Sequence, residues 1–254
     1  MPFIDRDGVT VSYEIHGDAS GGVPLLLSHG YSASSAMWTS NLPALSAARQ
    51  VVTWDIRGHG HSASPSDPSA YSEAASVADM AAVLDRCGID KAAVGGLSLG
   101  GYLSLAFHCA LADRVAALLL FDTGPGYKND EAREQWNGYA EARAVAFERE
   151  GVGALSESPE VGMGTHDPKG LALAARGILT QHDAGVINSL PSIRVPTLVL
   201  VGSNDTPFLA AASYMAAKIP GATKIVIDDA GHASNIDQPA AFNEAVVRFL
   251  EEES

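Results

Sequence analysis

The chain has 254 residues, of which 46% are hydrophobic and 18% are charged. This length and composition suit one sizeable globular domain with a substantial core, and they exclude a disordered or low-complexity protein. The net charge of −14, with no cluster of lysine and arginine, makes nucleic acids and anionic membrane surfaces poor partners.

The start of the chain has no basic stretch followed by an apolar one, so no secretory signal is predicted. The two cysteines, Cys87 and Cys109, lie outside any Cys-x-x-Cys pair, which favours free thiols in a reducing compartment. A charge-free run over residues 92–112 holds four glycines, two serines and a histidine, so we interpret it as strand, turn and buried helix. We therefore expect a cytoplasmic protein with no membrane partner.

Asp7-Gly8 predicts a hairpin turn near the start, so we expect the sheet to begin with an antiparallel pair. Downstream, apolar segments alternate with helical patterns. This alternation predicts an α/β fold with a mostly parallel twisted sheet of about eight strands and helices on both faces. The predicted strands span residues 9–15, 24–27, 51–55, 92–97, 116–122, 197–201 and 224–227. The predicted helices of this part span residues 34–47, 72–87, 99–110, 210–219 and 240–251.

Residues 123–190 break the alternation. They are rich in glycine and proline and hold helical stretches at 130–150 and 169–180, but no strand candidate. We predict a core domain made of residues 1–122 and 191–254, with 123–190 inserted as a small helical cap. Ligands of such sheets bind outside the carboxyl ends of the strands, where this segment departs, so we expect the cap to roof a binding site.

The run Gly96-Leu97-Ser98-Leu99-Gly100 places a serine in a Gly-x-Ser-x-Gly pattern between a predicted strand and a predicted helix. A serine on such a sharp turn has a strained backbone and an exposed hydroxyl. The first N–H groups of the new helix also point toward any negative charge that develops beside it. We predict Ser98 to be a nucleophile.

A serine hydroxyl needs a base to take its proton and a third group to orient that base. Asp205 follows one downstream strand and His232 follows the next, so the order of nucleophile, acid and histidine is that of a nucleophile elbow on an α/β sheet. We predict the triad Ser98, His232 and Asp205. Asp122 also ends a strand and remains an alternative acid.

The oxyanion formed during attack on a carbonyl needs donors that are already in place. The N–H of Leu99, directly after the nucleophile, is one predicted donor, and the N–H of Tyr31 is the other. Tyr31 follows His29-Gly30, where the glycine allows a tight turn. We expect His29 to brace this loop by a hydrogen bond rather than to act as a base.

With these motifs the chain resembles the α/β-hydrolase-fold enzymes. The resemblance covers everything except the helical insertion, which matches the position of that family's variable cap. It implies a hydrolase that needs no cofactor and no metal and works through an acyl-enzyme on Ser98. The matching segments are Ser28-His29-Gly30, residues 55–62, Gly96 to Gly101, Gly202 to Asp205 and Gly231-His232.

Within that family the serine at position 98 excludes branches that use an aspartate nucleophile, such as haloalkane dehalogenases and epoxide hydrolases. The resemblance to carboxylesterases and 3-oxoadipate enol-lactonases remains. Two alternatives stay open: a cofactor-free haloperoxidase or perhydrolase of the same fold, and a ligand-binding protein with slow or absent turnover.

The predicted partner is a small-molecule ester or lactone, and the sequence leaves open whether the protein is a monomer or a homodimer. In the predicted helix 130–150, Trp136, Arg143 and Phe147 share one face. This face either packs on the core or forms the substrate site. In the second case Trp136 and Phe147 would wall the pocket and Arg143 would receive a substrate carboxylate.

Overall fold

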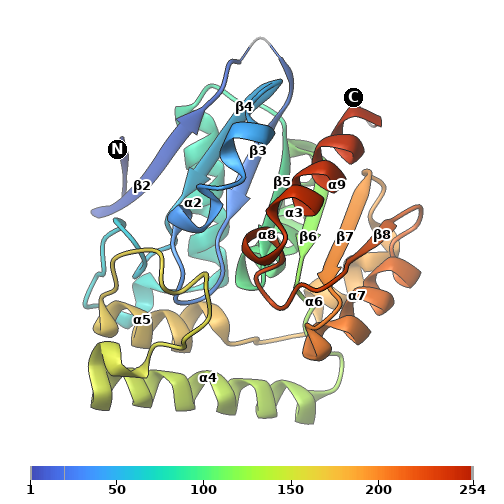
Figure 1. Ribbon diagram of the computed structural model, residues 1–254. Coiled ribbons are helices and arrows are strands. Elements are labelled where there is room, and N and C mark those ends of the chain that lie inside the picture. The colour runs from blue at the N-terminus through green and yellow to red at the C-terminus, as the bar shows by residue number, and fades with distance from the viewer. Residues whose placement is uncertain (1, 20, 253–254) are drawn as a thin grey trace.

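The computed structural model describes residues 2–19 and 21–252 and contains the predicted sheet (Figure 1). Its eight strands lie in the order β1-β2-β4-β3-β5-β6-β7-β8. The hairpin β1–β2 and the β2–β4 pair are antiparallel, and every later pair is parallel, which confirms the predicted fold class. The strands are β1 (Phe3–Arg6), β2 (Val9–His16), β3 (Gly22–Ser28), β4 (Arg49–Trp54), β5 (Ala92–Leu97), β6 (Val115–Phe121), β7 (Thr197–Gly202) and β8 (Thr223–Ile227).

Helices cover both faces because successive side chains of the strands point to opposite sides. Leu26 of β3 belongs to the core cluster that contains α2 (Glu73–Arg86), α3 (Leu99–Leu111) and α7 (Thr206–Lys218). Its neighbours Leu25 and Leu27 belong to the opposite cluster, with α9 (Pro239–Glu252). Two short helices, α1 (Leu42–Leu45) and α8 (Ser234–Asp237), complete the core.

The predicted helix over residues 34–47 is wrong as a continuous element. A 3₁₀ helix at Ser35–Trp38 is followed by the single turn α1. Pro43 lies at the start of α1, where its missing N–H is harmless, but in the interior of a longer helix it would lose a hydrogen bond and clash with the preceding turn. For the same reason α7 begins at Thr206, just before Pro207, and not at residue 210.

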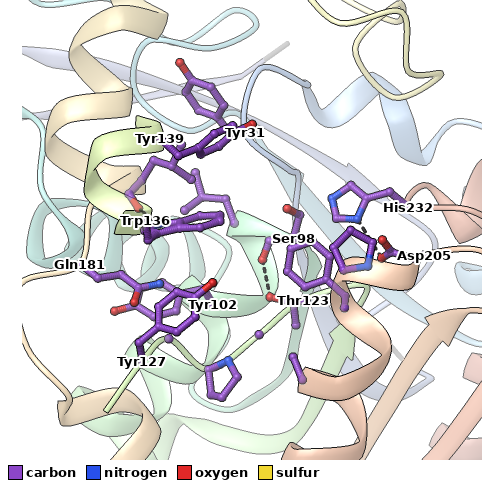
Figure 2. Close-up of a pocket in the computed structure, with 18 of the residues that line it drawn as sticks. Tyr31, Ser98, Tyr102, Thr123, Tyr127, Trp136, Tyr139, Gln181, Asp205 and His232 are labelled. Atoms are coloured by element: carbon purple, nitrogen blue, oxygen red, sulfur yellow. Dashed lines mark hydrogen bonds and ion pairs between the residues drawn. The ribbon is translucent and has the colours of Figure 1, made fainter. Parts of the chain in front are cut away.

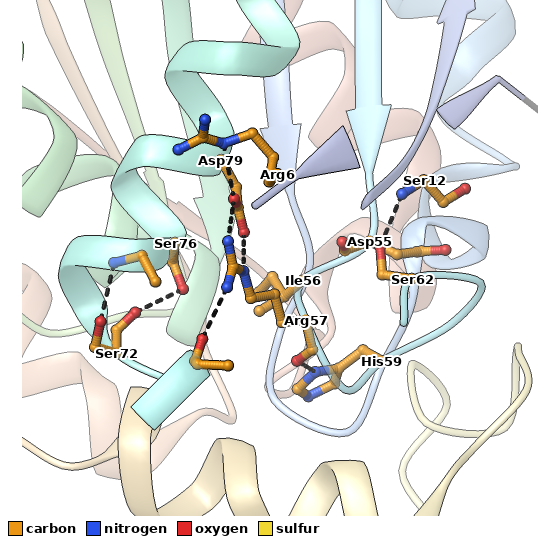
Figure 3. Close-up of polar contacts among 12 residues, drawn as sticks. Arg6, Ser12, Asp55, Ile56, Arg57, His59, Ser62, Ser72, Ser76 and Asp79 are labelled. Atoms are coloured by element: carbon orange, nitrogen blue, oxygen red, sulfur yellow. Dashed lines mark hydrogen bonds and ion pairs between the residues drawn. The ribbon is translucent and has the colours of Figure 1, made fainter. Parts of the chain in front are cut away.

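The loop after β4 is fixed by buried polar contacts (Figure 3). Arg57 donates to both oxygens of Asp79 on α2, at 2.5 and 2.8 Å, and to the carbonyl of Ala70 at 3.0 Å. Asp55 accepts from the backbone N–H groups of Ser35 and His61 at 2.7 and 2.8 Å. These bonds tie the loop to α2 and to the segment that follows β3.

The segment 123–190 contains the long α4 (Asp130–Glu150), the short α5 (Pro168–Ala174), which continues as a π-helical turn at Ala175–Leu179, and α6 (Gly185–Ser189). Figure 1 shows α4 lying across the edge at which the parallel strands end. The boundaries of a cap at residues 123 and 190 stay a prediction, but the helices expected there are present. None of the helices among the described residues is long and apolar enough to cross a bilayer.

Candidate active site

Ser98 lies at the tight turn between β5 and α3. Its backbone has φ 55° and ψ −115°, a left-handed conformation that is strained for a residue with a side chain. The turn is possible because Gly96 and Gly100 have no side chain. A Cβ would lie only 2.5 Å from the carbonyl oxygen of Ser28 at position 96, and only 2.3 Å from it at position 100. The Ser98 N–H donates to Phe121 at 2.9 Å, and the hydroxyl of Thr123 donates to the Ser98 carbonyl at 2.6 Å. The chain is therefore held on both sides of the serine.

His232 and Asp205 form a pair beside this turn. Nδ1 of His232 lies 2.9 Å from Oδ2 of Asp205, whose side chain is almost fully buried. Asp205 directly precedes α7, where a carboxylate often caps the helix, but here its side chain makes no capping bond and turns to the histidine instead. The ring of Phe208 stacks on His232 with centroids 4.9 Å apart.

The electrostatics of this pair favour a protonated imidazole. Burial alone lowers the pKa of His232, but the hydrogen bond from the ring to Asp205 and the charge of that carboxylate outweigh it, so the pKa is raised above 6.5. A histidine that is oriented by a hydrogen bond to a buried carboxylate is suited to act as a general base.

Asp122, the alternative acid, is held differently. One of its oxygens accepts from the Gly202 N–H at 2.7 Å and the other accepts from the hydroxyl of Ser234. Burial raises its pKa to about 7, although both hydrogen bonds act in the opposite direction. The structure thus pairs His232 with Asp205, while Asp122 links the turn after β7 to the segment after His232.

The loop after β3 brings its backbone against Ser98. A Cβ placed on Gly30 would lie 3.5 Å from that of Ser98, and both Tyr31 and Leu99 line the cavity above the serine. His29 is fully buried, with Nδ1 2.7 Å from the Gly30 carbonyl and Nε2 accepting from the Ile56 N–H at 3.0 Å. Both ring nitrogens are therefore occupied, and His29 braces the loop as expected.

A cavity of about 940 Å³ opens above Ser98. Figure 2 shows Ser98 between two walls, with His232 and Asp205 on one side and Tyr31, Tyr139 and Trp136 on the other. The volume suits a small or medium organic molecule. Aromatic rings make up much of the lining, contributed by Tyr31, Tyr102, Tyr127, Trp136, Tyr139, Phe208 and Tyr214.

Two of the three predicted substrate-binding residues line this cavity. Trp136 does so while its Nε1 donates to the Leu179 carbonyl at 2.8 Å, and Arg143 does so while its Nη2 donates to the Ala154 carbonyl at 2.6 Å. Phe147 does not, because it is 1% exposed and packs in a separate cluster with Leu171 of α5. It shares a face with Trp136, but it lies about 16 Å further along the helix, beyond the cavity.

Other lining residues escaped the sequence analysis. Gln181 follows the π-helical turn, and Ser156, Ser158 and Glu160 lie in the loop before α5. This loop has no hydrophobic periodicity from which a direction of its side chains could be derived. No group of three or more potential metal ligands gathers among the described residues.

Comparisons with known proteins show the family to which this fold belongs. The chain is 29% identical over 269 residues to "Putative carbamate hydrolase RutD" of Azorhizobium caulinodans, with 99% of each protein aligned. The crystal structure of the enol-lactonase from Burkholderia xenovorans LB400 matches with a TM-score of 0.80 at 29% identity, covering 98% of this chain and all of that one. A thermophilic esterase from Thermogutta terrifontis matches with a TM-score of 0.84 at 30% identity, covering 99% and 97%. The model of the alpha/beta hydrolase family matches residues 25–245, and the chain belongs to that family.

Proposed function

We propose that this protein is a serine hydrolase that cleaves carboxylic esters or lactones through an acyl-enzyme. The observation that carries the proposal is the strained Ser98 in one cavity with His232, whose Nδ1 is already bonded to Asp205. This is the arrangement of a nucleophile, a base and an orienting acid. The enol-lactonase and esterase among its structural relatives support the same class of substrate.

In the proposed reaction, Oγ of Ser98 attacks the carbonyl carbon while Nε2 of His232 takes the hydroxyl proton. The N–H groups of Tyr31 and Leu99 donate to the oxyanion of the tetrahedral intermediate. The intermediate then collapses, the C–O bond to the leaving group breaks, and His232 returns its proton to the departing alkoxide. A water molecule, deprotonated by His232, attacks the acyl carbon of the resulting acyl-enzyme. The bond from that carbon to Oγ then breaks, and His232 returns the proton to Oγ of Ser98.

The test is hydrolysis of p-nitrophenyl esters from acetate to octanoate by the wild-type protein and by Ser98→Ala. We expect turnover that peaks at one acyl length, and a loss of about 10³-fold or more in kcat in the variant. Ser213→Ala, which changes an exposed serine on α7, is the matched control and should keep wild-type rates. Near-normal turnover in Ser98→Ala would refute the mechanism.

A fluorophosphonate probe separates an enzyme from a binding protein. One covalent adduct per chain, absent in Ser98→Ala, is expected from an activated serine even when no tested ester is turned over. Lactones and N-alkyl carbamates extend the substrate series, and peroxide-dependent bromination in acetate buffer tests the perhydrolase alternative. The carbamates are included because of the name of the Azorhizobium relative.

A further inference from the structure

Glu160 is a buried acid in the wall of the proposed active site. It lies in the loop between the 3₁₀ helix Gly151–Ala154 and α5, it lines the same cavity as Ser98, and it is only 6% exposed. No described residue donates a hydrogen bond to its carboxylate, and Oε2 is buried without any partner. Oε2 is therefore cut off from water without a hydrogen bond from the protein to replace it, and a ligand that donates to it would offset that cost.

The loop that carries Glu160 is attached to the core at several points. The Ser34 hydroxyl donates to the Met163 carbonyl at 2.8 Å, and the Thr165 hydroxyl donates to the Gly60 carbonyl at 2.9 Å. His166 forms a backbone bridge with His59. The segment that follows Glu160 is therefore fixed to the core. The charge of the Glu160 carboxylate is among those that raise the pKa of His232.

Arg143, the cationic side chain that lines the cavity besides His232, is directed elsewhere. The guanidinium of Arg143 donates to the Ala154 carbonyl at 2.6 Å and lies over the ring of Phe147, 5.1 Å from its centroid. It is thus held by a carbonyl and a ring outside the cavity rather than by Glu160. A substrate cation would be the group that completes the environment of the acid.

The remaining lining favours the same kind of ligand. The faces of tyrosine and tryptophan rings attract cations, and the cavity contains Tyr127, Trp136 and Tyr139 in one wall. The net charge of −14 also attracts cations and repels anions at long range.

We propose that Glu160 makes this site selective for esters that carry a positively charged amine in the acyl or the alcohol part. The inference rests on the proposed ester hydrolysis and names its substrate class. The ammonium group would pair with the carboxylate while the ester carbonyl reaches Ser98. An anionic substrate would instead face an unpaired buried acid.

The experiment compares esters of equal shape and different charge. On the alcohol side, 2-(trimethylammonio)ethyl acetate is compared with 3,3-dimethylbutyl acetate. On the acyl side, the phenyl ester of 4-(trimethylammonio)butanoate is compared with that of 5,5-dimethylhexanoate and with the monophenyl ester of glutarate. In at least one series we expect kcat/KM for the cation to exceed that for its neutral analogue by about 10-fold or more.

Glu160→Gln keeps the shape of the side chain and removes its charge. The ratio of cationic to neutral kcat/KM should fall toward one in this variant, and because it is a ratio within one protein, partial misfolding does not affect it. Glu157→Gln is the matched control, since Glu157 is exposed on the same loop and does not line the cavity. A wild-type ratio near one in both series, a preference for the glutarate ester, or an unchanged ratio in Glu160→Gln overturns the proposal.

Binding to Ser98→Ala separates this inference from the proposed function. Calorimetry measures recognition without turnover. It compares Ser98→Ala with the double variant Ser98→Ala, Glu160→Gln, using 2-(trimethylammonio)ethyl acetate and 4-(trimethylammonio)butanoate phenyl ester as ligands. Glu160-dependent binding of either cation together with no serine-dependent hydrolysis would support the cation site and refute the hydrolase. Hydrolysis of the neutral esters with no Glu160-dependent binding of either cation would do the reverse.

Discussion

Asp205 and Asp122 are both buried in the neighbourhood of His232, and their partners give them different chemical roles. Asp205 is bonded to Nδ1 of the histidine, whereas Asp122 is bonded to the Gly202 N–H and the Ser234 hydroxyl. Pairs of acids whose environments differ in this way typically divide the work between them. We assign Asp205 to orienting the base and Asp122 to holding together the two loops that carry the acid and the base.

The first prediction concerns pH. In the proposed mechanism the neutral imidazole of His232 is the base, and its pKa is raised above 6.5, so kcat/KM should rise with pH through an apparent pKa above that value. Asp205→Asn removes the charge that raises the pKa, so the midpoint should move down, and kcat should fall by about 10³-fold or more. A pH profile of both proteins with one ester measures both effects. An unshifted midpoint would contradict the assignment.

Asp122 provides a second prediction, on stability. Its carboxyl has a pKa near 3.8 when unfolded and about 7 when folded, so between these values the folded state binds the extra proton. The contribution of Asp122 to the free energy of unfolding should therefore decrease as pH rises from 4 to 7, by at most about 1.4 kcal/mol per pH unit. Asp122→Asn lacks this titration. The free energy of unfolding of Asp122→Asn, measured with urea, should therefore improve relative to that of wild type as the pH rises. If the free energies of the two proteins changed in parallel with pH, the raised pKa of Asp122 would be refuted.

Among the helices, strands and loops, those whose residues are close together in the sequence were predicted, and those positioned by contacts far away in the sequence were not. The turn at Ser98 was predicted because the Gly-x-Ser-x-Gly pattern and the strand and helix beside it are adjacent in the sequence, although the contact that excludes a side chain at Gly96 and Gly100 comes from Ser28 on β3. The side chains of the loop at residues 155–167 were not, because contacts with Ser34 and Gly60, far away in the sequence, position it. Periodicity also placed Phe147 on the correct face of α4 without indicating how far along the helix the cavity extends.

The element α4 therefore offers a paired prediction. Phe147→Ala should destabilise the protein by about 3–4 kcal/mol, because it removes a buried ring from the contact with α5, and should leave the preferred acyl length unchanged. Trp136→Ala enlarges the cavity and should move the preference toward longer or bulkier acyl groups. Urea unfolding and the p-nitrophenyl ester series measure the two effects. A shift in acyl preference in Phe147→Ala alone would place the cavity further along α4.

At the scale of the whole molecule, the parts are held together by buried polar contacts as well as by the two cores. Arg57 and Asp79 join the loop after β4 to α2, and Arg6 of β1 lies 3.4 Å from the same carboxylate. The loop at residues 55–62 in turn contacts Thr165 in the loop of Glu160. The brace formed by Arg57 and Asp79 thus fixes the same loop that contacts the segment carrying Glu160.

Breaking that brace is the last prediction. Asp79→Ala leaves the Arg57 guanidinium buried without its partner and should lower the free energy of unfolding by about 3–5 kcal/mol. The double variant Arg57→Met with Asp79→Leu removes both charges, so its loss should be clearly smaller than that of the single variant. The exposed pair Arg248–Glu252 is the control, and Glu252→Ala should leave urea unfolding unchanged within error because water screens both groups. If the double variant were as unstable as Asp79→Ala, shape rather than charge would account for the contribution of this contact, and the assigned electrostatic brace would be wrong.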